Sequence, residues 1–450
     1  MIYYFEGGAA MQYKKILCLV LLLAVLLLTG CAVRTADQMY QLPKRSEDFN
    51  NLQSAIDLAM AGLEYCAPLA GENRQTVQMA DLDGNGDMEY LLFAKGSAER
   101  PLRILVFDEV MDSFQHIDTI ESMGSGFDLV KYVQMDDKPG VEMVVGSLLS
   151  DQVLRSVSVY GFSHKKAEML MSANYTKFLT IDLDGDDRSE LFVLRPGQGV
   201  TDNGVAELYG MEDGTMERSN EVNMSEPVDH LKRIVIGKLY GGEPAVYAAS
   251  TVGDTALITD VFALRNEMLA NISFSNESGT SVQTLRNYYV YADDIDNDGA
   301  IELPYLITMK PLDTQDAADR HDLIRWYTMK SDGSEVNKLY TYHNFVGGWY
   351  MELDSKWASR IAVQRQGNNY AFYLWDRDYE NARKVMTVFA LTGQNRDMQN
   401  SDQDRFVLLK TDSITYAASV EPAAKSYGIT QQTVLRSFHL IQQDWKTGET

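Results

Sequence analysis

Short apolar runs alternate with polar turns from residue 77 to about residue 345, and this alternation predicts β-strands. Five segments repeat within that region, each with a polar turn that closes on a glutamate and leads into an apolar run. The closing residues are Glu89, Glu142, Glu190, Glu243 and Glu302. Their spacings of 53, 48, 53 and 59 residues leave room for four short strands per repeat. Four strands in a repeat of this length are typical of a β-propeller blade, so we expect a mainly β fold with six or seven blades.

The C-terminal part repeats this pattern less well. A degenerate sixth repeat, without a closing glutamate, is expected to begin at residues 349–354. The strands expected after it are 360–364, 370–375, 385–391, 406–410 and 414–419. A helix should follow, capped by Thr430, with an apolar stripe made of Val434, Phe438, Ile441 and Trp445. Residues 346–450 are therefore a degenerate blade, a small α+β domain, or both, and the pattern leaves these alternatives open.

An amphipathic helix is expected ahead of the repeats. From Ser46, placed to cap it, to residue 65, apolar residues occur at helical spacing. They are Phe49, Leu52, Ile56, Met60 and Leu63. We expect residues 46–76 to form this helix and a lead-in segment, residues 31–45 to form a tether, and residues 77–345 to form the repeats.

The N-terminal region has the features of an export signal. Two lysines, at 14 and 15, precede an unbroken apolar run at 16–28, which is shorter than the roughly 20 residues of a membrane-spanning helix. The sequence Leu-Thr-Gly-Cys that ends at Cys31 resembles a bacterial lipobox, which implies cleavage after residue 30 and a lipid on Cys31. Met11 is the expected start residue, because residues 1–10 are unlike the beginning of a signal peptide.

Charge and cysteine content narrow the possible partners. The chain has 40 Lys and Arg against 64 Asp and Glu, a net charge of −24, which disfavours nucleic acid and favours divalent cations. Of three cysteines, Cys18 belongs to the signal and Cys31 takes the lipid, so Cys66 is left without an intramolecular partner. We expect Cys66 to be a buried small residue.

Three of the turns carry the ligand pattern of a calcium loop. Oxygen side chains at positions 1, 3, 5 and 9, with a backbone carbonyl at position 7, can surround one hard cation, and carboxylate-rich oxygen ligands favour Ca²⁺. Loop one has Asp81, Asp83, Asn85, the carbonyl of Asp87, and Glu89. Loop two has Asp182, Asp184, Asp186, the carbonyl of Arg188, and Glu190. Loop three has Asp294, Asp296, Asp298, the carbonyl of Ala300, and Glu302.

The residue at position 12 and the strand-like flanking segments distinguish these loops from EF-hands. An EF-hand requires glutamate at position 12 between two helices, whereas position 12 here is Leu92, Val193 or Tyr305, each in a strand-like run. Position 6 needs a residue that tolerates positive φ; loops one and three have glycine there, and loop two has Asp187.

These Asp-x-Asp-x-Asp/Asn loops, closed by glutamate and followed by an apolar strand, resemble the FG-GAP and VCBS repeats of integrin-α-type β-propellers. The resemblance covers residues 77–345 and implies a propeller whose loops join the first two strands of each blade and bind about three Ca²⁺ ions. The chain lacks the Phe-Gly and Gly-Ala-Pro signature of that family. Two shortened turns make Asp136, Glu142 and Glu243 weak ligand candidates.

No motif predicts catalysis. The six histidines occur singly, no Gly-x-Ser-x-Gly or phosphate-binding loop is present, and most acidic clusters belong to the metal turns. A carboxylate pair of the glycosidase type is not excluded by the sequence. Trp349, Tyr350 and Trp357 are interpreted as packing residues, with a sugar-stacking or protein-binding patch as the alternative.

The expected function is therefore non-covalent binding of a protein or glycan by a lipid-anchored, calcium-binding propeller outside the cytoplasm. The alternatives are an envelope scaffold or assembly lipoprotein and, less favoured, a carbohydrate-active enzyme.

Overall fold

The computed structural model describes residues 47–441, except 112, 150–153, 199–202, 289, 313–319, 395 and 397–403. The expected signal segment, Cys31 and the tether lie outside the described residues. The chain divides into two compact units: residues 1–59 with 109–115, and residues 60–108 with 116–450. The larger unit contains nearly all of the strands. No described helix is long and apolar enough to cross a membrane.

The smaller unit contains helix α3 (Glu47–Ala59), in which Leu52 and Ile56 are buried. The helix is shorter than the span predicted from residue 46 to residue 65. It ends before Gly62, whose φ of +79° suits a turn and not a further helical residue. The chain then enters a short strand at Glu64, so Leu63 is not on the helix. Ser46, the expected cap, lies outside the described residues.

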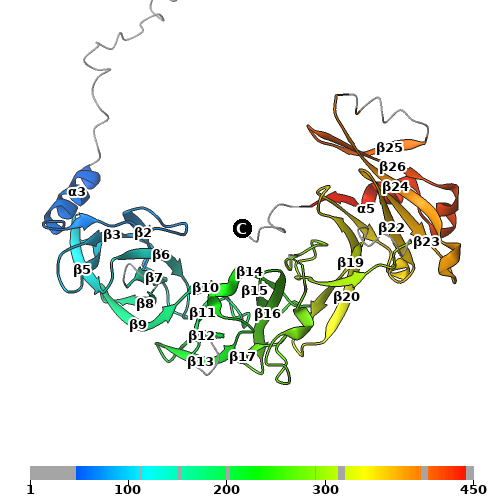
Figure 1. The fold of residues 1–450 in the computed structure, drawn as a ribbon. Helices are drawn as coiled ribbons and strands as arrows, with labels where there is room; N and C mark the ends of the chain where they lie inside the picture. Colours follow the sequence, from blue (N-terminus) through cyan, green and yellow to red (C-terminus); the bar gives the residue numbers. More distant parts are fainter. Residues whose placement is uncertain are drawn as a thin grey trace, which may run out of the picture. The chain divides into compact units, whose positions relative to one another are not determined.

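The larger unit is mainly β, as the sequence predicts, and its strands form six antiparallel sheets (Figure 1). Sheet one contains β1 (Glu64–Tyr65), β2 (Val77–Ala80), β3 (Glu89–Lys95), β4 (Leu102–Glu109) and β5 (Phe114–Ser122). Sheet two contains β6 (Gly126–Val133), β7 (Glu142–Leu148), β8 (Arg155–Ser163) and β9 (Lys166–Tyr175). Sheet three contains β10 (Lys177–Ile181), β11 (Glu190–Pro196), β12 (Gly204–Glu212) and β13 (Thr215–Asn223).

Sheet four contains β14 (Leu231–Lys238), β15 (Pro244–Val252), β16 (Ala256–Arg265) and β17 (Met268–Asn271). Sheet five contains β18 (Leu303–Thr308), β19 (Asp322–Met329), β20 (Glu335–Asn344), β21 (Trp349–Leu353) and β27 (Phe438–Leu440). Sheet six contains β22 (Ile361–Gln366), β23 (Asn369–Leu374), β24 (Arg383–Thr392), β25 (Arg405–Lys410) and β26 (Ile414–Val420). Short 3₁₀ turns are η1 (Val228–His230), η2 (Val282–Thr284), η3 (Ser355–Trp357), η4 (Tyr379–Asn381) and η5 (Pro422–Tyr427).

Sheets two, three and four each contain the four consecutive strands expected of one repeat. The glutamate-closed turns join the first two strands of sheets two, three and four, as predicted, whereas in sheet one the turn joins β2 to β3 because the short β1 precedes them. Loop three differs, because the segment before it forms only an isolated bridge between Asp293 and Glu302 and no full strand.

Buried clusters join each sheet to the next one in the chain. Successive side chains on a strand point to opposite faces, so Met143 and Val145 pack towards sheet one while Val144 packs towards sheet three. Burial on both faces explains why the second strands read as continuous apolar runs. Among the described residues, no cluster joins sheet six to sheet one. Cys66 is half-buried against the cluster between sheets one and two, and not fully buried as expected.

The C-terminal strands lie where expected, but their assignment to sheets differs from the prediction. The segment 349–354 does not begin a sixth sheet: β21 pairs with β20 and completes sheet five. Thr430 caps helix α5 (Gln431–Ser437), and its hydroxyl accepts a hydrogen bond from the Thr433 amide at 3.2 Å. The helix ends at residue 437 because the next three residues pair with the free edge of β21. Phe438 and Ile441 are therefore not helical, and Trp445 lies outside the described residues.

Candidate metal centres

Each of the three acidic loops brings three carboxylates together. Within each group, ligand oxygens lie within 4.8 Å of one another, close enough to share one cation. The groups are Asp81, Asp83 and Glu89; Asp182, Asp184 and Glu190; and Asp294, Asp296 and Glu302. The sequence-predicted residues at positions 1, 3 and 9 are thus brought together in all three loops.

Backbone amides hold the first aspartate of each loop in place. Asp81 Oδ2 accepts a hydrogen bond from Gly86 N at 3.0 Å, and Asp294 Oδ2 accepts one from Gly299 N at 2.9 Å. In loop two the same position is held by Asp187 N, at 3.0 Å from Asp182 Oδ2. The donors at position 6 have φ values of +93°, +88° and +68°, as the pattern predicts. A tight turn of this kind points the side chains of positions 1 and 3 towards the same interior.

In loops one and three the closing glutamate is the most buried member of its group. Glu89 and Glu302 have no exposed surface, and their Oε2 atoms accept hydrogen bonds from Leu82 N at 2.7 Å and Ile295 N at 3.0 Å. Among the described residues, the Oε1 atoms of both glutamates are buried without a hydrogen-bond partner. A buried carboxylate oxygen without a donor is unfavourable, and a cation bound among the three carboxylates would compensate it.

The pKa values of the three closing glutamates also reflect their burial among carboxylates. Burial, reinforced by the nearby carboxylates of Asp83 and Asp108, raises the pKa of Glu89 to about 7. Burial also raises the pKa of Glu190 to about 7 and that of Glu302 to about 8. A divalent ion among the carboxylates would oppose this effect and favour the ionised form.

The residues at position 5 lie outside the carboxylate groups. Asn85 Oδ1 accepts a hydrogen bond from Asp87 N at 2.6 Å, Asp186 pairs with Arg188, and Asp298 pairs with Lys338. The two cations lower the pKa of these aspartates. Ligand roles for Asn85, Asp186 and Asp298 and for the carbonyls of Asp87, Arg188 and Ala300 remain predictions.

The two shortened turns keep the backbone interaction but not the carboxylate group. Glu142 Oε2 accepts a hydrogen bond from Met135 N at 2.8 Å, as the other closing glutamates do. Asp136 is instead paired with Lys138, whose Nζ lies 3.0 Å from Asp136 Oδ2. Glu243 is exposed. Neither turn has a three-carboxylate group within the described part of the chain.

The acidic loops also contact neighbouring sheets, which the sequence pattern did not reveal. Any side chain at Gly84 of loop one would overlap the backbone of Pro139 and Gly140 in the turn of sheet two. Ser189 N of loop two donates to Gln134 O of sheet two at 2.8 Å. Ile301 N of loop three donates to Lys238 O of sheet four at 3.0 Å. The Pro-Gly pair at 139–140 is the one sequence feature that could have indicated such a close approach.

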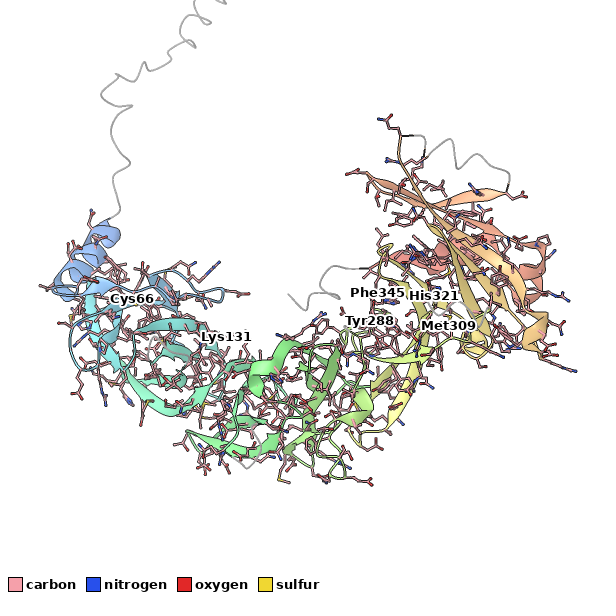
Figure 2. The ribbon with its side chains drawn as sticks, in the orientation of Figure 1. Cys66, Lys131, Tyr288, Met309, His321 and Phe345 are labelled. Atoms are coloured by element: carbon pink, nitrogen blue, oxygen red, sulfur yellow. The ribbon has the colours of Figure 1, made fainter. Side chains whose placement is uncertain are left out.

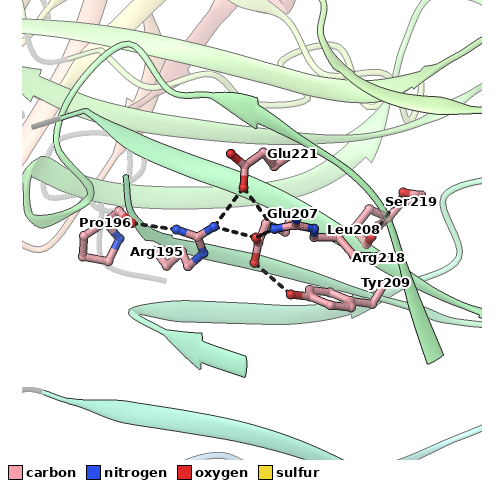
Figure 3. Close-up of polar contacts among 8 residues, drawn as sticks. All are labelled: Arg195, Pro196, Glu207, Leu208, Tyr209, Arg218, Ser219 and Glu221. Atoms are coloured by element: carbon pink, nitrogen blue, oxygen red, sulfur yellow. Dashed lines mark hydrogen bonds and ion pairs between the residues drawn. The ribbon is translucent and has the colours of Figure 1, made fainter. Parts of the chain in front are cut away.

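The buried carboxylates among the described residues outside the three loops are engaged in ion pairs or hydrogen bonds. Figure 3 shows Glu207 and Glu221 sharing Arg195 and Arg218, with Glu207 Oε1 2.7 Å from Arg195 Nη2 and 2.6 Å from Arg218 Nη1. Although burial opposes it, these cations lower the pKa of Glu207. Such a group stays ionised and is a poor proton donor, so the arrangement favours structure over acid catalysis.

The buried carboxylate of Asp260 is likewise held by neighbours. It accepts hydrogen bonds from the hydroxyls of Ser225 and Ser281, each at 2.6 Å, and from Asn271 Nδ2 at 2.9 Å. These contacts join the segment after β13 to β16 and to the loop before η2, which is a structural role.

Of the six histidines only His343 is buried, and His116, His164 and His230 are exposed. Burial lowers the pKa of His343 to about 3, so this ring is neutral at ordinary pH. His321 lines a cavity of about 130 Å³ together with Tyr288 and Phe345 (Figure 2). Trp349 and Tyr350 are buried, which confirms the packing interpretation for both, whereas Trp357 is half-buried.

No protein-family model matches the chain, and no curated protein matches it. Solved structures similar to this chain include the Bacillus licheniformis rhamnogalacturonan lyase PL11, with 13% identity, a TM-score of 0.27, and coverage of 72% of both chains. The exotype rhamnogalacturonan lyase YesX has 13% identity and a TM-score of 0.26, over 72% of this chain and 68% of that one. The rhamnogalacturonan lyase YesW has 12% identity and a TM-score of 0.27, over 72% and 64%. At these TM-scores the likeness supports no inference about fold or activity.

Proposed function

We propose that this protein is a calcium-binding, lipid-anchored β-propeller of the FG-GAP/VCBS type that binds a protein or glycan at the bacterial cell surface. The observation that carries the proposal is the threefold recurrence of a carboxylate group closed by a glutamate, which is buried in loops one and three and half-buried in loop two. Oxygen-only ligands in a strand-to-strand turn favour Ca²⁺ over softer metals.

The propeller is supported by antiparallel sheets of four or five strands that follow one another in the chain and pack in sequence order. Anchoring is supported by the lipobox-like sequence that ends at Cys31. Recognition is supported by fold-level analogy, because a rigid scaffold that presents many loops suits binding. An envelope scaffold is the second candidate, and it would bind its partners whether or not calcium were present.

Calcium titration of the full chain in detergent, by calorimetry, tests the metal part of the proposal. We expect about three sites for the native chain, and one fewer for each of Asp81→Ala, Asp182→Ala and Asp294→Ala. Asp136→Ala is the matched control, because this aspartate lies in a shortened turn and should leave the stoichiometry unchanged. A native chain that binds no calcium would contradict the proposal.

Recognition needs a separate measurement. Immobilised protein should retain an envelope protein or glycan in calcium and release it in chelator. Retention that ignores chelator would instead support the scaffold alternative. Product release from a polysaccharide, lost on changing one carboxylate outside the three loops, would support an enzyme.

A further inference from the structure

A cavity of about 380 Å³ lies where sheet five meets sheet six and helix α5, within the larger unit. Its lining comes from β21, η3, β24, η5 and α5. Met351, Leu353 and Met386 form part of this lining and also belong to the packed core between the two sheets. The volume falls in the range of about 300–1,000 Å³ that is typical of small-molecule sites. None of the lining residues belongs to the acidic loops, so the cavity is a separate feature.

The aromatic part of the lining presents hydrocarbon to the cavity. Trp357 and Tyr427 are both half-buried and both line it. The only polar atom of the indole, Trp357 Nε1, is buried. The accessible part of this side chain is therefore ring carbon, which suits an apolar or C–H-rich surface of a ligand.

The other polar side chains of the lining are two carboxylates, one lysine and two hydroxyl residues. Glu352 and Asp354 have side chains 46% and 42% exposed. Lys356 Nζ lies 2.7 Å from Asp354 Oδ2, and His439 Nε2 lies 3.1 Å from Glu352 Oε1. Each carboxylate has further acceptor capacity for hydroxyl donors, and the exposed Thr433 lies on the same lining.

We infer that this cavity binds an uncharged saccharide, an inference that deepens the proposed recognition role by naming a site and a ligand class. A sugar ring has a C–H face that packs on an aromatic ring and an edge of hydroxyls that donate to carboxylates. An acidic sugar is disfavoured, because the one lysine in the lining already pairs with Asp354 and the whole chain has a net charge of −24.

Calorimetry of the full chain in detergent tests this site with defined probes. The neutral probes are cellotetraose, chitotetraose and mannotetraose, and the charged comparator is tetragalacturonate. We expect at least one neutral probe to bind and the comparator to bind more weakly. Trp357→Ala should weaken binding about tenfold, and Tyr240→Ala, which removes an exposed aromatic outside the cavity, should leave it unchanged.

A second variant keeps the test independent of folding. Glu352 is exposed, so Glu352→Gln should fold normally and still weaken binding about threefold. The inference is overturned if no neutral probe binds, if the charged comparator binds best, or if both cavity variants bind like the native chain. Calcium binding with capture of a protein, but without saccharide binding, would remove this inference and leave the proposed function standing. Saccharide binding at this cavity by a chain that binds no calcium would support this inference and contradict the calcium part of the proposed function.

Discussion

The turn at residues 81–89 and the turn at residues 134–142 occupy the same place in neighbouring sheets, yet only the first gathers three carboxylates. Both close on a glutamate whose Oε2 holds a backbone amide, Leu82 N at 2.7 Å in one and Met135 N at 2.8 Å in the other. In the second turn Asp136 is instead paired with Lys138, whose Nζ lies 3.0 Å from Asp136 Oδ2.

The comparison separates two roles of the closing glutamate. One oxygen maintains the turn and is retained in both loops. The other oxygen, Oε1, is buried without a partner in Glu89 but not in Glu142, as far as the described residues show. A repeat can therefore keep its backbone geometry without gathering three carboxylates, and in this turn Asp136 is paired with the ammonium of Lys138 instead.

The largest expected effect concerns the contact between these two turns. Gly84→Ala should destabilise the protein by about 3 kcal/mol, since the added carbon would overlap the backbone of Pro139 and Gly140 at a φ of +71°. Gly86→Ala is the matched control: nothing lies within 4 Å of its added carbon, so only the strain of its φ of +93° remains, about 1 kcal/mol. Urea unfolding measures both. Equal losses of stability in Gly84→Ala and Gly86→Ala would show that the two turns are not in tight contact.

Replacing the closing glutamate by glutamine separates its two roles, holding a backbone amide and supplying charge to a cation. Glu89→Gln keeps an acceptor for Leu82 N but removes the charge that a cation needs. At calcium ten times above Kd, this variant should lose about 1.4 kcal/mol of stability, the contribution of one site. Glu142→Gln should show no calcium-dependent loss. The measurement is unfolding with and without chelator, and a calcium-dependent loss in Glu142→Gln would contradict the distinction.

The smallest expected effect concerns Lys338. This lysine forms an ion pair with an aspartate of loop three, as Lys138 does with Asp136 in the shortened turn. Lys338 Nζ contacts Asp298 and lies 3.4 Å from Asp296 Oδ2, where it competes with a bound cation. Lys338→Met should therefore tighten calcium binding at that loop about fivefold, or ~1 kcal/mol. Lys138→Met should create no new site, because the carboxylates of its turn do not form a three-carboxylate group. Calcium titration distinguishes these results, and weaker binding in Lys338→Met would show that the lysine supports the site.

The sequence predicted much of this arrangement because the relevant information is local. Carboxylate spacing, positive φ at position 6 and alternating apolar runs are properties of short segments. In loops one to three the carboxylates at positions 1, 3 and 9 lie together and position 6 has a positive φ, as predicted. The end of helix α5 at Ser437 and the strand pairing of the residues after it were not predictable in this way. Phe438 continues the apolar stripe of a helix, but the free edge of β21 offers backbone partners that lie far away in the chain.

The same limit applies to the charges around the loops. Lys338 pairs with Asp298 from 40 residues away, and Lys165 pairs with Asp108 across two sheets. The cavity beside Trp357 depends on β21, η3, β24, η5 and α5, which meet only in the folded chain. Sequence reasoning treated the aromatic residues at 349–357 as one group, whereas the structure buries two of them and leaves the third at a cavity.

The most direct test of the central claim is a thermal melt of the full chain in detergent with calcium, magnesium or chelator. At calcium ten times above Kd, three occupied loops should add about 4 kcal/mol to the free energy of unfolding. We predict a calcium-specific rise in melting temperature that each of Asp81→Ala, Asp182→Ala and Asp294→Ala reduces and that Asp136→Ala leaves intact. A melting temperature indifferent to chelator would mean that the three carboxylate groups hold no calcium, and the account of these loops would be wrong.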